Sequence, residues 1–448
     1  MQIVEKTAET LKRQFPAGSL RARMARGTSW LVLGTLTLQL SAMLGAILSA
    51  RILGKDGFGK LNILRSTILM FGVLAGSGLG VIATKYVSEF RDTEPDRAGK
   101  LLGLVLKISL LTGASATVAC FFLASPIAGH AMNSIGLTNS LRLGSMLLLL
   151  NALNGVQMGV LCGFESFRLM SGLTILDALL SLILIPLGAY LFGVIGAVGG
   201  IVAGTVISFP IKHGAMKREC RRKNVVISFV RAKTDLAEIT KTILPIMLLG
   251  IGFYPFEWLS KIFLARRPGG FSQLGLFAAA YSFGSIVLFV PNQLLSTTQP
   301  FLGNMVGKKD MRAFRRLSLF SVALTGGVGL LIAGVLAVLS KQLMRAYGAT
   351  FVEAAGVLVV MSFGYVFYAL LTPYYKMHIA RNKIWAQASF IVLLGLSLVG
   401  SAYALTSRGA LGLAYSYFIA WFLTFAVQSF FVWRMIGPNP RIEATPDL

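Results

Sequence analysis

Six ionisable residues lie within or at the ends of long apolar stretches of this chain, where a charge is costly. Four are basic and two are acidic: Arg51, Arg65, Lys107, Lys261, Asp177 and Glu257. Because the basic residues outnumber the acidic ones, a cavity lined by them would be cationic. A guanidinium facing such a cavity can hold a phosphate through two parallel hydrogen bonds. Arg51 and Arg65 are therefore candidates to bind a phosphate group, with Lys107 assisting from the inner side.

Structural roles compete with each of these charged sites. Glu257 and Lys261 have the i, i+4 spacing of a local ion pair. Lys107 and Asp177 lie at matching depth and are partners for each other if neither binds substrate. The two arginines have long side chains that can reach the membrane surface. The sequence leaves these alternatives open.

One apolar stretch, 143–162, also carries uncharged polar residues. Asn151, Asn154 and Gln157 fall close to one face of a helix. Their amides suit sugar hydroxyls, and they equally suit hydrogen bonds to neighbouring helices. Both roles remain open at this point.

Motifs of enzymatic chemistry are missing from the sequence. There is no phosphate-binding glycine loop of the Walker type, no G-x-S-x-G and no carboxylate pair in an accessible loop. Cys120, Cys162 and Cys220 have no paired spacing. We expect no enzymatic reaction, no metal and no cofactor. Energy for any transport would come from a gradient, the membrane potential or removal of the substrate.

Composition identifies the elements that position these residues. The 448-residue chain is 55% hydrophobic and only 13% charged, with a mean hydropathy of +0.73. A soluble chain would carry roughly twice that charged fraction. Apolar runs of about 20 residues recur and can cross a membrane as helices. The fold class is therefore an all-α polytopic membrane protein with about twelve spans: 29–50, 61–84, 101–124, 143–162, 172–192, 194–211, 242–264, 274–298, 317–339, 354–375, 385–405 and 410–432.

The net charge of +25 points to membrane orientation rather than to nucleic acid. With both termini on the cytoplasmic side, Lys and Arg on the inner segments far outnumber those on the outer loops, as the positive-inside rule requires. The longest polar segment, 212–241, is strongly basic and connects the sixth span to the seventh.

An internal repeat divides the chain into two halves. The stretch Ser49–Ser66 has a degraded copy at Leu264–Phe283, and the GxxG pair at Gly193 recurs at Gly409, at an offset of about 215 residues. An even number of spans in each half makes the repeats parallel. The expected organisation is a cytoplasmic basic amphipathic tail (1–27), a six-helix bundle (28–211), a cytoplasmic basic linker (212–241), a second six-helix bundle (242–433) and a cytoplasmic tail (434–448).

Small residues and prolines predict how these helices pack and bend. Two glycine faces indicate close helix contacts: Gly72, Gly76 and Gly80 in the second span, and Gly196, Gly200 and Gly204 in the sixth. Prolines lie in the seventh and eighth spans but not in the first and second, which predicts hinges for an alternating-access motion, or static kinks, in the second half: Pro245, Pro255 and Pro291.

The repeated stretch also carries a family resemblance. Ala50-Arg51-Ile-Leu-Gly54 with Phe58-Gly59, the second-half segment Gly275-Leu-Phe-Ala-Ala-Ala-Tyr281, and the glycine turns at 193 and 409 resemble Wzx-type polysaccharide flippases. These belong to the multidrug/oligosaccharidyl-lipid/polysaccharide exporter (MOP) superfamily. The resemblance implies two six-helix bundles in a V around a central cavity. It also implies a bacterial inner-membrane protein that moves an undecaprenyl-diphosphate-linked oligosaccharide to the outer leaflet, with membrane lipid and polysaccharide polymerase or assembly proteins as partners and no nucleic acid.

The alternative within the same superfamily is a proton- or sodium-coupled antiporter of drugs or cations. The related antiporters often have a carboxylate in the first span, where the most polar residue here is Gln39. This departure weakens the case for cation export. Since the family often has an acidic residue near the position of Glu257, the resemblance implies an ion-coupling role for Glu257, with Asp177 as the other candidate.

Overall fold

The computed structural model describes residues 20–76, 78–229, 253–294, 298–308, 310–381 and 383–436. Within these ranges every regular element is helical, so the predicted all-α fold is confirmed. Eight helical stretches are long and apolar enough to cross a membrane. Three of them contain a sharp turn, at Gly54, at Phe192–Gly193 and at Thr406–Gly409, so each of these three holds two crossings.

The first half of the chain forms five long elements. They are α2 (Leu20–Leu74), α3 (Leu79–Phe90), α4 (Pro95–Pro126), α5 (Thr138–Gly163) and α6 (Phe167–Arg222). Two short helical turns, Ile127–Ala131 and Ile135–Leu137, join α4 to α5. After α6 an extended segment follows α4 so closely that Gly99 and Gly103 meet its backbone directly.

The second half repeats this pattern with more interruptions. Its helices are α8 (Tyr254–Ala265), α9 (Gly270–Gly284), α10 (Ile286–Leu294), α11 (Thr298–Gly307), α12 (Met311–Val338), α13 (Ser340–Tyr347), α14 (Ala355–Ala380), α15 (Ile384–Leu405) and α16 (Gly409–Ile436). Helix α12 starts about 216 residues after α4, and α16 begins at the glycine equivalent to the turn inside α6.

The backbone itself confirms the internal repeat at its turns. Gly193 has φ 62° and ψ −139°, and Gly409 has φ 67° and ψ −145°. A positive φ of this kind favours glycine because a Cβ would be strained there. The two halves therefore reverse direction with the same local geometry.

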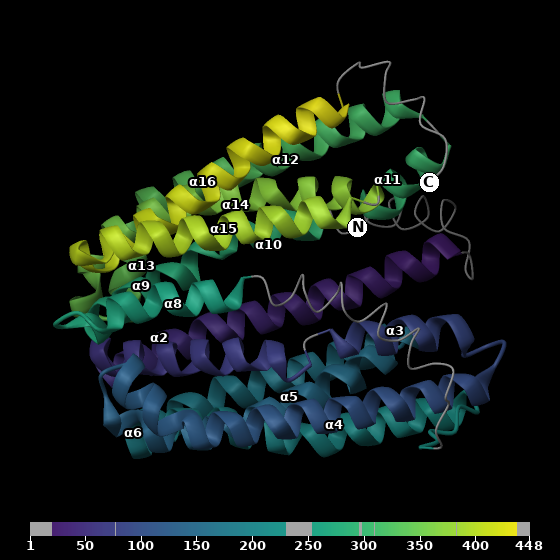
Figure 1. Ribbon diagram of the computed structural model, residues 1–448, viewed down its shortest axis with the longest axis horizontal. Coiled ribbons are helices and arrows are strands. Elements are labelled where there is room, and N and C mark those ends of the chain that lie inside the picture. The colour runs from purple at the N-terminus through teal and green to yellow at the C-terminus, as the bar shows by residue number, and fades with distance from the viewer. Residues whose placement is uncertain are drawn as a thin grey trace, which may run out of the picture.

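The two groups of helices lie side by side, with α2 to α6 below and α8 to α16 above in Figure 1. They approach most closely at the end that carries the turns Gly54, Gly193, Gly269 and Gly409, which we call the turn end. At the opposite end, which we call the terminal end, lie Leu20 of α2 and Ile436 of α16.

Exposed aromatic side chains mark both ends of the bundle. Such side chains concentrate where a membrane meets water. At the turn end, three aromatic residues are each more than two thirds exposed: Tyr190, Phe192 and Tyr403. At the terminal end, Trp385 and Trp433 are exposed to the same degree. Their placement fits the two boundaries of a membrane-spanning protein.

Contacts across the turn end obey the symmetry of the repeat. A Cβ on Gly59 would lie 1.8 Å from the carbonyl oxygen of Phe271, and one on Gly275 would lie 1.9 Å from that of Lys55. Gly59 and Gly275 are equivalent in the repeat, and so are Lys55 and Phe271. Each half therefore presses its glycine against the same backbone position of the other half.

The predicted second span, 61–84, is not one continuous helix. It breaks between Leu74, where α2 ends, and Leu79, where α3 begins. Gly76 consequently lies in the break, and the expected glycine face through Gly72, Gly76 and Gly80 is wrong at its centre. The other face is confirmed, because Gly196 and Gly200 pack directly on the backbone of Gly188 and Leu184.

Helix interruptions occur in both halves. In the second half, α9 ends at Gly284 just before α10, which contains Pro291. In the first half, the break between Leu74 and Leu79 contains glycines instead. Pro255 occupies the first turn of α8, where a proline fits without strain. Pro245 lies outside the described residues.

Candidate functional site

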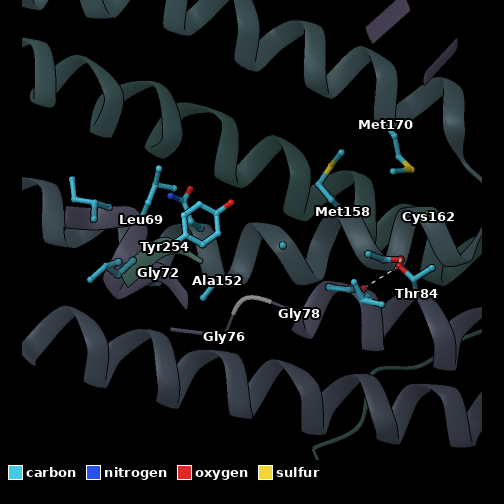
Figure 2. A pocket seen from close by; sticks show the side chains of 17 residues that line it. Leu69, Gly72, Gly76, Gly78, Thr84, Ala152, Met158, Cys162, Met170 and Tyr254 are labelled. Atoms are coloured by element: carbon cyan, nitrogen blue, oxygen red, sulfur yellow. Dashed lines mark hydrogen bonds between the residues drawn. The ribbon is translucent and has the colours of Figure 1, made fainter. Parts of the chain in front are cut away.

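A pocket of about 480 Å³ lies where the helix break of the first half faces the second half. We call it the N-side pocket. Its walls come from α2, α3, α5 and α6, and Tyr254 of α8 enters it from the other group of helices (Figure 2). Since residues of both halves line this pocket, its shape depends on how the halves are placed.

Glycine conformations build the break that forms the pocket floor. Gly76 has φ 117° and Gly78 has φ 108°, which other residues rarely adopt. The hydroxyl of Thr112 donates to the carbonyl of Ala75 at 2.9 Å and satisfies an acceptor that the broken helix leaves open. Gly78 and Gly80, at the start of α3, line the pocket. A helix N-terminus of this kind carries partial positive charge.

Helices α3 and α5 meet backbone to backbone beside the pocket. A Cβ on Gly159 would lie 2.1 Å from the carbonyl oxygen of Gly80. Thr84 fixes this contact, because its hydroxyl lies 2.9 Å from the carbonyl oxygen of Gly159 and 3.0 Å from that of Gly80 (Figure 2). The pocket wall is therefore held without bulky side chains, and its centre stays open.

Arg65 lies on a narrow exposed strip of an otherwise buried helix. In the second part of α2, Arg65 and Leu69 are exposed, while residues 63–64 and 66–68 are buried. Leu69 and Gly72 continue the strip by one turn each and line the N-side pocket. No ion pair or hydrogen bond joins Arg65 to any described residue. Its guanidinium is thus free to bind an anion beside the pocket.

The polar residues of α5 divide into two groups. Asn151 is exposed and lines the N-side pocket. Asn154 and Gln157 are buried, and their side-chain carbonyl oxygens have no hydrogen-bond partner among the described residues. Neither is among the residues that line the pocket.

Arg51 and Lys107 lie elsewhere and bind backbone carbonyls. Arg51 donates from Nε to the carbonyl of Ala346 at 2.8 Å, so it bridges the two halves at the turn end. Lys107 donates to the carbonyl of Phe229 in the extended segment after α6. The structure brings neither of them to the lining of the N-side pocket.

Asp177 pairs with a residue that the sequence analysis did not consider. Its carboxylate lies 2.6 Å from the ammonium group of Lys212, whose side chain is almost fully buried. Both residues belong to α6, on the two sides of its turn. The expected pair between Lys107 and Asp177 is therefore wrong, because the hairpin inside α6 supplies a closer partner.

The predicted pair of Glu257 and Lys261 is confirmed. The carboxylate of Glu257 lies 2.7 Å from the ammonium group of Lys261, and both residues are buried. The ammonium group also lies 5.5 Å from the centre of the Tyr281 ring, a cation–π arrangement. Tyr365 and Tyr417 contact Tyr281 and extend this buried aromatic cluster.

Of the eight predicted site residues, only Asn151 lines the N-side pocket; Arg65 lies one helical turn before Leu69 of the lining, and the other six lie outside it. Sequence reasoning missed Tyr254 and the helix break. The signal for the break was present as four glycines between 72 and 80, but a regular small-residue spacing is the same for a packed helix and for a broken one. Tyr254 gave no signal, because only the packing of the halves brings it to α3.

The described residues contain no group of His, Cys, Asp and Glu that could hold a metal ion. The three cysteines are unpaired thiols, and of these Cys162 lines the N-side pocket. The lining offers an amide, a phenol and a helix N-terminus, and Arg65 adds a guanidinium one helical turn away. This set can bind and orient an anion with polar substituents.

A protein-family model described as "Polysaccharide biosynthesis protein" matches residues 24–306. A search of curated protein sequences finds no match. Among solved structures, the chain is similar to an inward-facing multidrug resistance MATE family transporter of the MOP superfamily. The similarity has 17% identity over 91% of this chain and 98% of the transporter, with a TM-score of 0.76.

Two further structures share the fold at lower scores. An outward-facing MATE family transporter of the MOP superfamily has 16% identity over 92% of this chain and 95% of that one, with a TM-score of 0.63. A MOP superfamily transporter from Pyrococcus furiosus, described as having a binding pocket of reverse polarity, has 15% identity over 92% and 95%, also at 0.63. The fold is that of these transporters, and the score is higher for the inward-facing one.

Proposed function

Because this chain belongs to the polysaccharide biosynthesis protein family of the MOP superfamily, and is a membrane transporter by family and fold, we propose that it is a flippase for lipid-linked oligosaccharides. Its substrate would be an undecaprenyl-diphosphate-linked repeat unit for O-antigen, capsule or exopolysaccharide synthesis. One observation carries this proposal: Arg65 is exposed and unpaired on the strip that leads to the N-side pocket. A free guanidinium inside a membrane protein requires an anionic partner, and the diphosphate supplies one.

The diphosphate would bind at Arg65, one helical turn before Leu69 of the pocket lining. The guanidinium can engage phosphate oxygens bidentately. Asn151 would donate to a bridging oxygen or a proximal hydroxyl. Arg51 and Lys107 would meet the substrate only in another arrangement of the halves, after leaving their present carbonyl partners.

We propose that the two halves, 28–211 and 242–433, alternate between two arrangements around this site. The contact of Gly59 and Gly275 at the turn end would be the closed outer side. The terminal end would then face the cytoplasm, with both chain termini and the 212–241 linker there. In the cell the bacterial inner membrane would be its location, and a polysaccharide polymerase would be a partner that consumes the flipped substrate.

The test uses purified protein in vesicles that contain a fluorescent undecaprenyl-diphosphate oligosaccharide. Exposure of the label on the far leaflet should accelerate with the protein and return to the lipid-only rate in Arg65→Ala. Arg434→Ala is the matched control, since Arg434 is an exposed arginine on α16 outside the pocket. Full activity of Arg65→Ala at normal folded yield would refute the role of Arg65. No acceleration by the unmodified protein would refute the flippase.

A drug or cation antiporter is the second candidate, favoured by the fold shared with multidrug transporters. In that case Glu257, with Asp177 as the other candidate, would couple transport to protons or sodium. Glu257→Gln should then abolish the dependence of transport on a pH or sodium gradient. An unchanged dependence in that variant would assign Glu257 to its ion pair with Lys261.

A further inference from the structure

A second pocket of about 320 Å³ lies inside the second half, among α8, α14, α15 and α16. We call it the C-side pocket. Every residue that lines it is uncharged, and the polar ones carry amides, hydroxyls and phenols. Tyr254 lines this pocket and the N-side pocket alike. The two pockets are therefore adjacent at this side chain.

Two glutamines from different helices form the polar wall of the C-side pocket. Gln428 of α16 donates from Nε2 to Oε1 of Gln387 of α15 at 2.9 Å. The Nδ1 of buried His378 lies 2.8 Å from the same oxygen. The same Nδ1 lies 3.2 Å from Nε2 of Gln428, so the three side chains form one buried polar cluster. In the described part of the chain the amide nitrogen of Gln387 and the amide oxygen of Gln428 have no other partner.

The network fixes these free amide atoms in place. The ring of His378 stacks on Phe390, with centroids 5.5 Å apart, and His378 and Gln428 are both almost completely buried. A donor and an acceptor held this rigidly lose little entropy when they bind a ligand. Aromatic side chains, among them Tyr375 and Phe390, complete the walls.

This chemistry selects a neutral ligand that carries many hydroxyl groups. Paired amide donors and acceptors match vicinal hydroxyls, and aromatic faces pack on the C–H faces of a sugar ring. A drug cation would require a carboxylate in the lining, and none of the lining residues has one. The free anion-binding group lies instead with the N-side pocket, at Arg65.

We propose that the C-side pocket binds the glycan of the transported lipid, while the N-side pocket binds its diphosphate. The inference rests on the proposed flippase function and adds to it a separate sugar subsite made by Gln387, Gln428 and Tyr254. The substrate would thus lie across both halves, which explains why Tyr254 lines both pockets.

The experiment compares two probes: undecaprenyl diphosphate carrying the cell's own oligosaccharide, purified from its membranes, and undecaprenyl diphosphate alone. Binding to the purified protein in nanodiscs is measured for Gln387→Leu and Gln428→Leu. Each variant should bind the glycan-bearing lipid about tenfold more weakly, the effect of losing about 1.4 kcal/mol of hydrogen bonding, and bind the glycan-free lipid unchanged. Arg65→Ala should weaken both probes.

Because the glutamine variants could misfold, two milder variants test the same pocket without altering the glutamine network. Thr372→Val and Tyr375→Phe each remove one hydroxyl from the lining, and neither residue belongs to the network. They should produce a smaller loss that is again specific to the glycan-bearing lipid. Gln342→Leu, at an exposed glutamine of α13 outside both pockets, is the control.

Each outcome has a separate meaning. An equal loss for both probes, or no loss for either probe in any lining variant, would overturn the sugar subsite while leaving the flippase proposal standing. If the unmodified protein neither binds nor moves either lipid, the proposed function itself fails. A loss confined to the glycan-bearing lipid supports the subsite.

Discussion

The internal repeat is symmetric at the turn end and asymmetric at the two pockets. At the turn end Gly59 contacts the backbone of Phe271, and the equivalent Gly275 contacts that of Lys55, so the contact is symmetric. In the pockets the symmetry is lost: the position equivalent to Arg65 is Tyr281, about 216 residues later. Symmetry persists where the two copies must fit each other, and it is lost in the pockets that we propose bind the substrate.

The two halves also differ in how they hold buried charge. Glu257 and Lys261 form a buried pair in the second half, whereas the equivalent positions of the first half are Ala42 and Ala46. Conversely, the position equivalent to Lys212 is Gln428, so an ion pair in the first half corresponds to an amide in the C-side pocket. The second half can therefore present a neutral pocket.

The largest effect is expected at Glu257. In Glu257→Gln the buried ammonium group of Lys261 loses its carboxylate, and removing one partner of a buried pair costs about 3–5 kcal/mol. Thermal and denaturant unfolding in detergent should show this loss. The double variant Glu257→Gln with Lys261→Met should recover most of it, since no charge then remains unpaired. A single variant as stable as the parent would show that the aromatic cluster alone holds Lys261.

An intermediate effect is expected at the symmetric glycines. Gly59→Ala or Gly275→Ala places a methyl group within 2 Å of a carbonyl oxygen of the other half, so the turn end must open. Overpacking of this kind costs about 1–3 kcal/mol. Spin labels on cysteines at Asp56 and Arg267 should report longer distances across the turn end.

The matched control is Gly334→Ala in α12, where an added Cβ meets nothing within 4 Å. Because the contact is reciprocal, the two turn-end variants should shift the distances by similar amounts. A shift in only one of them would mean that the halves do not depend on the symmetric contact.

Much of this fold was predictable from the sequence, because hydropathy and the repeat act locally. The apolar runs identified the spans, and the offset of about 215 residues located the turns at Gly193 and Gly409. The break at Gly76 was not predictable in the same way. Only the geometry with Thr112 and α5 decides whether closely spaced glycines pack a helix or interrupt it.

The site was less predictable, since its parts meet only through tertiary packing. Arg65 stood out because a charge in an apolar run is rare and visible. Gln387 and Gln428 are 41 residues apart on different helices and join through His378, which no spacing rule connects. The sequence suggested a pair of Asp177 with Lys107 because both lie at a similar depth in their apolar stretches. In the structure, the hairpin within α6 brings Lys212 to Asp177 instead.

The smallest effect is expected at that hairpin pair. The Asp177 side chain is 33% exposed, while that of Lys212 is 6% exposed, so water reaches one side of the pair. Solvent screening limits such an interaction, and Asp177→Asn should cost only about 1 kcal/mol in unfolding free energy. Raising the salt concentration should reduce the difference from the parent, because accessible charges are screened by ions. A cost as large as that of Glu257→Gln would mean that the two halves hold buried charge equally tightly, and that the neutral pocket of the second half needs another explanation.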